Sequence, residues 1–177
     1  MTLFPARPED LTDIAALVNR AYRGTEGWTH EGEYIAGQRT DPETLRADLA
    51  ATPMAELLTL RDGADGPLLG VVWLEPAGGD VWYLGMLTVR PDMQDRRLGR
   101  GLLTAAEAHV ARRGGRRVRM TVVSLREPLI VWYVRRGYEL TGETQAFPYE
   151  DQKLGEPRRG DLAFVVLEKT LGAISPP

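Results

Sequence analysis

The chain has 177 residues, of which 43% are hydrophobic and 27% are charged, and its formal net charge at pH 7 is -3. This length and composition predict one globular domain over residues 1–177 with a core of its own. The negative charge argues against a general nucleic-acid binder, which would carry a basic excess. The sequence holds no cysteine and only two histidines, so disulfides, a thiol nucleophile and thiolate-metal sites are excluded and no metal site is expected.

The hydrophobic stretches of the sequence are short. No apolar run approaches the roughly 18–20 residues that span a bilayer, and the first residues lack a basic segment followed by an apolar one. We therefore expect a cytoplasmic protein that binds neither membranes nor nucleic acid.

Segments rich in β-branched and alternating apolar residues predict the strands of a sheet. The three segments at 56–61, 68–74 and 81–89 are separated by turns rich in glycine and aspartate, which is typical of an antiparallel meander. The expected strands are 3–7, 56–61, 68–74, 81–89, 117–123, 138–144 and 161–169.

Apolar residues at helical spacing predict the helices. The first begins at residues 8–10, and the second begins at Pro42 with Asp41 as its N-cap. The third begins near Gly99 and ends at 114–115, and the fourth covers 127–136. Residues 24–38 are too polar for a core element and too aromatic for a plain linker, so a loop or short helix over a site is expected there.

A turn rich in arginine and glycine connects an expected strand to the third helix. Residues 87–103 read Leu-Thr-Val-Arg-Pro-Asp-Met-Gln-Asp-Arg-Arg-Leu-Gly-Arg-Gly-Leu-Leu. Free backbone N–H groups at a helix N-terminus favour an anion, and Gly99 and Gly101 let a phosphate approach the main chain. This segment predicts a phosphate or pyrophosphate site, with positive charge supplied by Arg90, Arg96, Arg97 and Arg100.

A second motif, at 129–138, reads Leu-Ile-Val-Trp-Tyr-Val-Arg-Arg-Gly-Tyr. Together the two segments resemble the GNAT superfamily of acyl-CoA-dependent N-acetyltransferases. In that family the first motif reads Val-x-Pro-x-x-Gln/Arg-x-x-Gly-x-Gly/Ala and the second reads aromatic-Tyr-x-x-x-Gly-aromatic. Both occur here in the family's order.

The first motif can be aligned with the family in two registers. Counting from Pro91 places Gln94 on the Gln/Arg position and Gly99 on the last glycine. In this register Arg97 stands where the middle glycine is usual. A register two residues later, ending at Gly101, fits the glycine spacing but not the distance from Pro91, so the sequence leaves both open.

The resemblance implies an α/β (α+β) fold, with a mixed, mostly antiparallel sheet of about six to seven strands and about four flanking helices. It implies acetyl-CoA as the cosubstrate. The cradle, which is the predicted phosphate site at the start of the third helix, binds it together with the preceding strand, and this strand separates from the neighbouring strand of the sheet. Arg126, at the family's usual asparagine position, contacts coenzyme A or lies in solvent at a helix start. The implied coenzyme A contacts are Leu87, Thr88, Val89, Gln94, Arg96, Arg97, Leu98, Gly99, Arg100, Gly101 and Arg126.

Acetyl transfer to an amine needs a held thioester, a neutral amine, a stabilised oxyanion and a proton for the departing thiolate. Tyr133 stands on the family's catalytic tyrosine position, and a phenol can protonate a thiolate as it leaves. The competing interpretation is that Trp132, Tyr133 and Tyr138 only pack at a helix–sheet junction. The general-base candidates, each of which also fits an exposed surface group, are Glu31, Glu33, Glu75 and His30.

Aromatic residues outside the helices predict the wall of an acceptor pocket. Acidic loop residues nearby favour a cationic amine, so the expected partner is a small-molecule or peptide amine. The last strands and the loop at 147–160 could also pair across a two-fold axis, which leaves a homodimer open. The candidate acceptor residues are Trp28, Tyr34, Tyr83, Phe147 and Tyr149.

The leading interpretation is an N-acetyltransferase that transfers the acetyl group directly to a primary amine, without a metal or a covalent enzyme intermediate. The alternative is a non-catalytic acyl-CoA-binding or sensor module on the same fold, against which Tyr133 argues. A nucleotide-binding oxidoreductase fits poorly, because the Gly-x-Gly-x-x-Gly pattern is absent and the strands form a meander instead of βαβ units.

Overall fold

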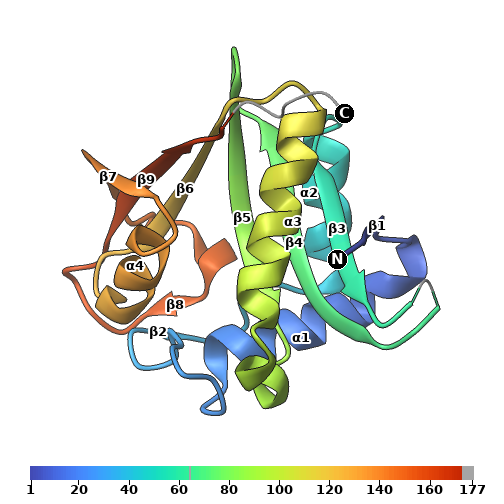
Figure 1. Cartoon of the computed structure of the whole chain (residues 1–177). Helices are drawn as coiled ribbons and strands as arrows, with labels where there is room; N and C mark the ends of the chain where they lie inside the picture. Colours follow the sequence, from blue (N-terminus) through green and yellow to red (C-terminus); the bar gives the residue numbers. More distant parts are fainter. Residues whose placement is uncertain (64, 173–177) are drawn as a thin grey trace.

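In a computed structural model, which describes residues 1–63 and 65–172 but not the side chains of residues 94–96 and 152, the chain forms a mixed sheet with helices on both faces (Figure 1). Within these residues the sheet has seven strands in the order β1-β3-β4-β5-β6-β9-β7. Only the β5–β6 pair is parallel there. The strands are β1 (Leu3–Pro5), β3 (Glu56–Arg61), β4 (Leu68–Pro76), β5 (Val81–Val89), β6 (Arg117–Val123), β7 (Glu139–Ala146) and β9 (Ala163–Thr170).

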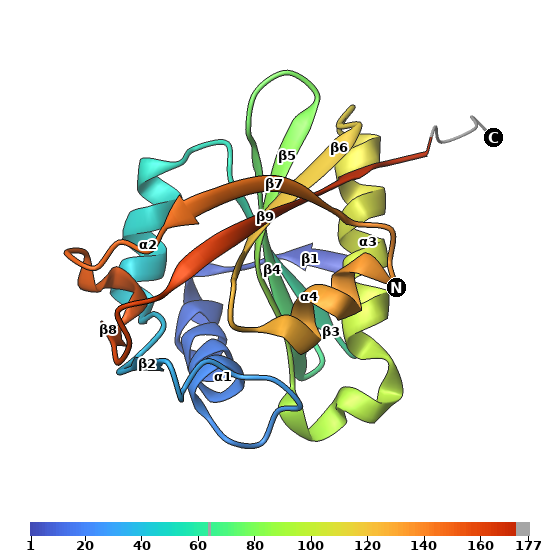
Figure 2. The ribbon, with the colours of Figure 1, turned by 90° about the vertical axis from the view of Figure 1, so that its left-hand side faces the viewer.

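The helices cover the sheet in two layers, as Figure 2 shows from the side. Helices α1 (Leu11–Arg23) and α2 (Pro42–Ala51) lie on one face, and α3 (Leu98–Arg112) and α4 (Glu127–Val134) lie on the other. The predicted N-cap of α2 is confirmed, because the Asp41 side chain accepts hydrogen bonds from the amides of Glu43 and Thr44. The mostly antiparallel sheet and the four helices of the described residues confirm the predicted fold class.

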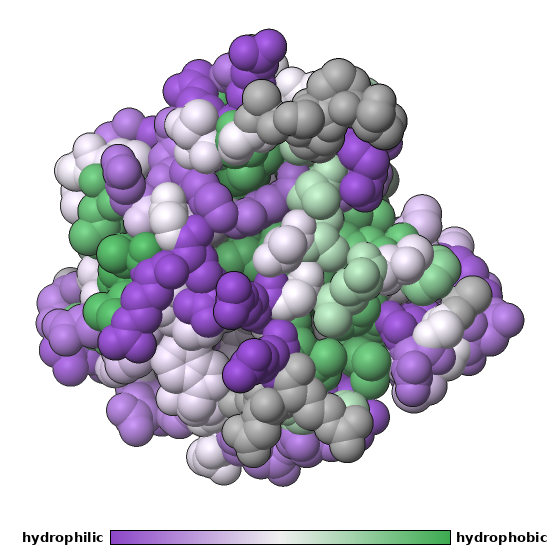
Figure 3. Space-filling model, viewed as in Figure 1, coloured by the Kyte–Doolittle hydropathy of each residue, from purple (hydrophilic) through white to green (hydrophobic). Residues whose placement is uncertain are grey.

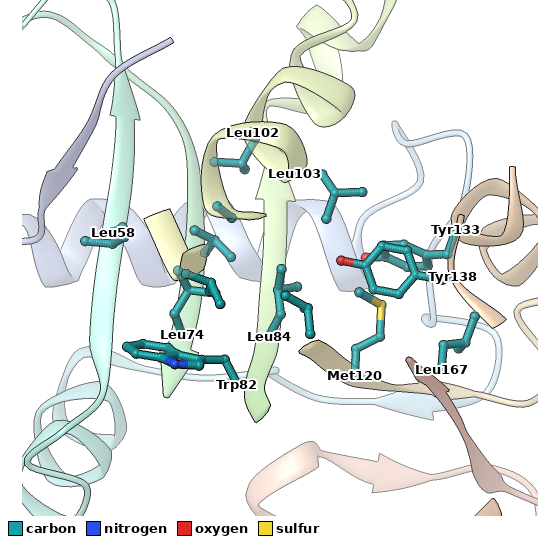
Figure 4. Close-up of a cluster of buried hydrophobic side chains, with 14 of the residues drawn as sticks. Leu58, Leu74, Trp82, Leu84, Leu102, Leu103, Met120, Tyr133, Tyr138 and Leu167 are labelled. Atoms are coloured by element: carbon teal, nitrogen blue, oxygen red, sulfur yellow. The ribbon is translucent and has the colours of Figure 1, made fainter. Parts of the chain in front are cut away.

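Alternation along the strands sends one set of side chains to each helical layer. On β3, Leu58 and Leu60 face α3 and α4, whereas Leu57 faces α1 and α2. The larger cluster runs from Leu58 across the sheet to Tyr133 and Tyr138, whose rings lie beside Met120 (Figure 4). This continuous core fixes α4 against the part of the sheet that contains β6.

Strands β5 and β6 are paired at one end and separate toward the other. Their register pairs Val81 with Arg117, Trp82 with Val118 and Tyr83 with Arg119. Beyond this point, residues 84–89 of β5 have no strand partner on the β6 side among the described residues, and the two strands diverge (Figure 1). The side chains of Tyr83 and Thr121 make the last link, with 3.2 Å between their hydroxyl oxygens.

A bulge bends β5 at the start of this opening. Met86 and Leu87 together lie opposite the single residue Val72 of β4, and Met86 has a left-handed φ of 52°. The buried Thr88 hydroxyl donates a hydrogen bond to the Met86 carbonyl over 3.0 Å, which holds the bulge. Bulges re-aim side chains and end regular pairing next to functional sites.

A two-stranded sheet closes the far side of the opening. Strand β2 (Ile35–Ala36), inside the segment predicted as irregular, pairs with β8 (Glu156–Pro157) from the loop after β7. The sequence prediction missed this pairing because two-residue strands carry no periodic pattern and their partner is distant in the chain. No helix within residues 1–63 and 65–172 combines the length and apolar character needed to cross a membrane.

Candidate functional site

Three connected hollows follow the opening between β5 and β6. We call them the inner cavity, of about 220 Å³, the middle channel, of about 90 Å³, and the outer groove, of about 490 Å³. Leu87, Arg126 and Tyr133 line both the inner cavity and the middle channel. Val89 and Gly99 line both the middle channel and the outer groove. The hollows therefore form one path from the surface to the centre of the sheet.

The outer groove lies at the N-terminus of α3. The first helical residues, Leu98, Gly99 and Arg100, follow Arg97, whose φ of 58° is left-handed. The amide of Gly101 already donates to the Arg97 carbonyl over 3.1 Å, so Gly101 offers no free amide to a ligand. This geometry supports the register counted from Pro91, in which Arg97 occupies the middle glycine position. A left-handed conformation is the one that glycine would adopt most easily.

Gly99 keeps the path open. A Cβ atom on Gly99 would lie 3.6 Å from the Trp132 ring and 4.0 Å from the Val89 side chain, in the space that joins the channel to the groove. Gly101 instead lies beneath the Met1 side chain and lines none of the three hollows, while Leu98 is buried in the core. The side chains of Gln94 and Arg96, also predicted to contact coenzyme A, lie outside the described residues.

Three arginines without a described carboxylate partner gather at the outer groove. Arg97, Arg100 and Arg136 line it, and among the described side chains no carboxylate pairs with them. The Arg136 guanidinium lies 3.5 Å from the Trp132 ring centroid. Burial, and the positive charges of Arg100 and Arg135, lower the Arg136 pKa. Hydrophilic side chains cover the surface between α4 and the lower half of α3 (Figure 3). The groove favours an anion because its described lining has three arginines and no carboxylate.

Arg90 does not belong to this group of unpaired cations. Its guanidinium forms a two-point hydrogen bond with Asp92, over 3.2 and 2.6 Å. The prediction that Arg90 contributes free charge to the cradle is therefore wrong, because a carboxylate two residues away neutralises it.

The middle channel runs along the unpaired edge of β5. Leu87, Thr88 and Val89 form one wall, and α4 forms the other. Trp28, predicted to wall the acceptor pocket, instead lines this channel and the outer groove, because residues 24–34 fold over the N-terminus of α4. Its side chain is 51% exposed.

Tyr133 lies where the middle channel meets the inner cavity. Its ring packs edge-on against Trp132 and Tyr138, at centroid distances of 5.0 and 5.6 Å. Burial raises the pKa of its hydroxyl, so the group stays protonated at neutral pH. Tyr133 thus belongs to the core through its ring and also lines the path.

A buried ion cluster holds the walls of the site together. Glu31 accepts from Arg23 over 2.7 Å and from Arg126 over 2.9 Å, and all three side chains are less than 10% exposed. Arg23 also donates to the Leu154 carbonyl. Through these contacts α1, the start of α4 and the segment before β8 are joined around one carboxylate. Arg126 thus lines the path, but it is neither solvated nor unpaired.

Glu31 is not the exposed surface group that the sequence suggested. Both of its oxygens are occupied by arginines, which makes it a poor acceptor for a proton from a ligand. Glu33 is exposed and Glu75 accepts from the Trp73 indole over 2.9 Å; neither lines the inner cavity, and nor does His30. Among the described residues Glu31 is the only carboxylate that lines this cavity.

Aromatic, cationic and apolar side chains line the inner cavity. Tyr22 lies between two arginines, with the guanidinium carbons of Arg126 and Arg39 at 5.3 and 5.7 Å from its ring centroid. Burial raises the Tyr22 pKa, against the opposing effect of these two charges. The apolar lining comes from β5, β6 and α4 and from residues of the loops around the cavity, which include Ile35, Phe147, Leu154 and Phe164.

Two of the five predicted acceptor residues, Tyr83 and Phe147, line the inner cavity. Tyr34 packs behind it in the small cluster around Ile35. Tyr149 is held by the Leu162 amide, which donates to its hydroxyl over 2.7 Å, and it lines none of the three hollows. Both residues support the loop instead of facing the site.

Sequence reasoning missed Tyr22 and Arg39. Tyr22 continues the apolar face of α1 from Ile14 and Val18 at four-residue spacing, so its direction toward the sheet could have been found. Arg39 lies in an irregular segment, where no pattern predicts the direction of a side chain.

Comparison with known proteins agrees with this geometry. The family described as Acetyltransferase (GNAT) family matches residues 12–138, well over half of the chain. A search of curated protein sequences gives no match.

Many solved structures share the fold. The ribosomal-protein-S18-alanine N-acetyltransferase from Escherichia coli is 15% identical, with a TM-score of 0.69 over 99% of this chain and 96% of that one. The PaiA N-acetyltransferase from Thermoplasma acidophilum, in complex with coenzyme A, is 17% identical, with a TM-score of 0.69 over 96% and 98%. YncA from Salmonella typhimurium, with its cofactor acetyl-CoA, is 19% identical, with a TM-score of 0.65 over 100% and 97%. At these identities the likeness shows the fold.

Replacing Glu31 with glutamine should destabilise the protein by about 3 kcal/mol, because two buried arginines lose their countercharge. Urea unfolding followed by tryptophan fluorescence measures the change. Glu26→Gln is the matched control: Glu26 also pairs with an arginine but is 56% exposed, so a loss below about 1 kcal/mol is expected. Equal losses in the two variants would contradict the role given to the buried cluster.

Arg97→Gly should be more stable than Arg97→Ala by about 1 kcal/mol, since both remove the charge but only glycine relieves the left-handed backbone. Thermal or urea unfolding of the two variants side by side gives the difference. An alanine variant as stable as the glycine variant would show that residue 97 is not held in this conformation.

Proposed function

Because the chain belongs to the GNAT acetyltransferase family, we propose that it transfers the acetyl group of acetyl-CoA directly to a primary amine. The observation that carries this proposal is the edge of β5 that has no described partner on the β6 side. It lines a path that leads from three arginines without a described carboxylate partner to Tyr133. When bound, acetyl-CoA supplies an activated acetyl group as a thioester.

The outer groove fits the phosphates of coenzyme A. Helix α3 begins at this groove, where the amides of a first helical turn have no intrahelical partner, and Arg97, Arg100 and Arg136 add charge that no described carboxylate neutralises. Charge-assisted hydrogen bonds to phosphate are stronger than neutral ones, so this end of the path would supply most of the binding energy.

The middle channel fits the pantetheine arm. It is narrow, it is lined by Leu87, Thr88 and Val89, and Gly99 leaves its entrance free of a side chain. Backbone groups of β5 on the side where β6 has diverged can pair with the amides of the arm as a further strand would. In this proposal the inner end of the arm reaches Tyr133, which lines the inner cavity together with Met86 of the bulge.

At Tyr133 the path opens into the inner cavity, where an amine can reach the thioester. In the transfer, the amine nitrogen forms a bond to the acetyl carbon and the carbon–sulfur bond breaks. Tyr133 donates its proton to the sulfur, and the proton released by the amine returns to the tyrosine through water. The raised pKa of Tyr133 keeps it in the acid form that this role requires.

The inner cavity favours an enzyme over a sensor. A protein that only binds acyl-CoA needs the outer groove and the middle channel, whereas this chain also has about 220 Å³ of space beyond Tyr133. A polar and aromatic wall faces that space, which is what a second substrate requires.

Tyr133→Phe should lower kcat by about 100-fold or more, while the Kd for acetyl-CoA stays within about threefold, because only the proton donor is removed. Thiol release from acetyl-CoA in the presence of a panel of amines gives kcat, and calorimetry gives Kd. The chain has no cysteine of its own to react with the thiol reagent.

Tyr138→Phe is the matched control, since Tyr138 packs against Tyr133 but lines none of the three hollows. It should retain wild-type turnover. Full activity of Tyr133→Phe would show that Tyr133 is not the proton donor. Failure of the wild-type protein to bind acetyl-CoA or to acetylate any amine would overturn the proposed function.

A further inference from the structure

The inner cavity carries more positive charge than its own carboxylate can balance. Glu31 is shared between Arg23 and Arg126, so its charge is already used. Arg39 also lines the cavity, and among the described residues no carboxylate pairs with its guanidinium. The sequence led us to expect acidic residues near the acceptor, which would favour a purely cationic amine. The inner cavity is not acidic in this way.

Arg39 is held in place by its backbone. Asn19, on α1, accepts hydrogen bonds at Oδ1 from the amides of Arg39 and Thr40, over 2.6 and 3.2 Å, and donates from Nδ2 to the Thr40 carbonyl over 2.8 Å. The Arg39 side chain then lies over the Tyr22 ring, whose other arginine neighbour is Arg126. A cation positioned in this way is organised before a ligand arrives, which lowers the entropic cost of binding.

A partly buried guanidinium without a countercharge is unfavourable, and an anionic group on a ligand would remove that penalty. The guanidinium fork suits a carboxylate, to which it can donate two parallel hydrogen bonds. Apolar side chains, among them Ile35, Phe147 and Phe164, form another part of the cavity wall.

From this juxtaposition we infer that the acceptor is a free amino acid with an apolar side chain. Its carboxylate binds Arg39, its side chain contacts the apolar wall, and its amine faces Tyr133. Arg39 is then the residue that determines specificity. This inference rests on the proposed acetyl transfer and names the substrate class for the same site.

The test compares amino acids with the amines that lack only the carboxylate. Leucine is compared with 3-methylbutylamine, methionine with 3-(methylthio)propylamine, and phenylalanine with 2-phenylethylamine. For each compound, kcat/KM is measured by thiol release with acetyl-CoA. We expect the best amino acid to exceed its partner amine by at least tenfold. In Arg39→Met that amino acid should lose 10- to 100-fold in kcat/KM, whereas its partner amine should change less than threefold.

Arg46→Met is the matched control, because Arg46 is an exposed arginine on α2 that lines none of the three hollows. It should behave as wild type, and Arg39→Lys should recover part of the preference for amino acids. Calorimetric binding of the same amino acids to the protein saturated with coenzyme A gives a second readout that needs no turnover, and Arg39→Met should weaken it at least tenfold.

Two failures can be told apart. Transfer to the decarboxylated amines at rates equal to or above those for the amino acids would overturn the inference and leave acetyl transfer standing. Absence of transfer to every amine, together with absence of amino-acid binding to the coenzyme A complex, would overturn both the inference and the proposed function.

Discussion

The separation of β5 from β6 is the constraint on which the site depends. A parallel pair that continued beyond Tyr83 and Arg119 would satisfy the backbone of β5 and leave no room for a ligand. The pair ends because β5 bends at the Met86 bulge, while the core around Met120 and Tyr133 holds β6 and α4 away from it. The backbone groups left without a strand partner are those that the proposed function assigns to the arm of acetyl-CoA.

Ion pairing divides the arginines near the site into two kinds. Arg23 and Arg126 are buried, paired with Glu31, and hold separate segments together. Arg97, Arg100 and Arg136 have no described carboxylate partner and remain available to an anion. Arginines that pair with a carboxylate therefore stabilise the walls of the site. Arginines without a described carboxylate partner offer their charge to a ligand. Arg39 belongs with the second kind, but inside the cavity.

Elements with a clear period could be predicted from the sequence. The meander, the four helices and the family resemblance are confirmed, because periodic apolar faces and two motifs with fixed spacing depend on local sequence. The observed strands end within one or two residues of the predicted ends. Strand β1, for example, is predicted to reach residue 7, but its pairing with β3 stops at Pro5. The family motif also placed Tyr133 on a segment that the structure brings to the path.

The inner cavity could not be predicted in the same way. Its walls come from segments that are far apart in the chain, such as β2 with β8 and Arg39 with Tyr22. Tyr34 and Tyr149 looked equivalent to Phe147 in the sequence, yet hydrogen bonding and packing turn them away from the cavity. Whether a loop side chain faces a site is decided by such tertiary contacts, which a single sequence does not display.

The most direct test of the account is amide hydrogen exchange of the protein with and without acetyl-CoA. Those amides within residues 84–89 of β5 that face away from β4, together with 98–100 at the start of α3, should exchange more slowly in the complex, because the thioester arm and the phosphates take up these N–H groups. Residues 81–83, already paired with β6, should change little. Binding of acetyl-CoA that leaves exchange at 84–89 unaltered would contradict the claim that the opened edge of β5 is the site.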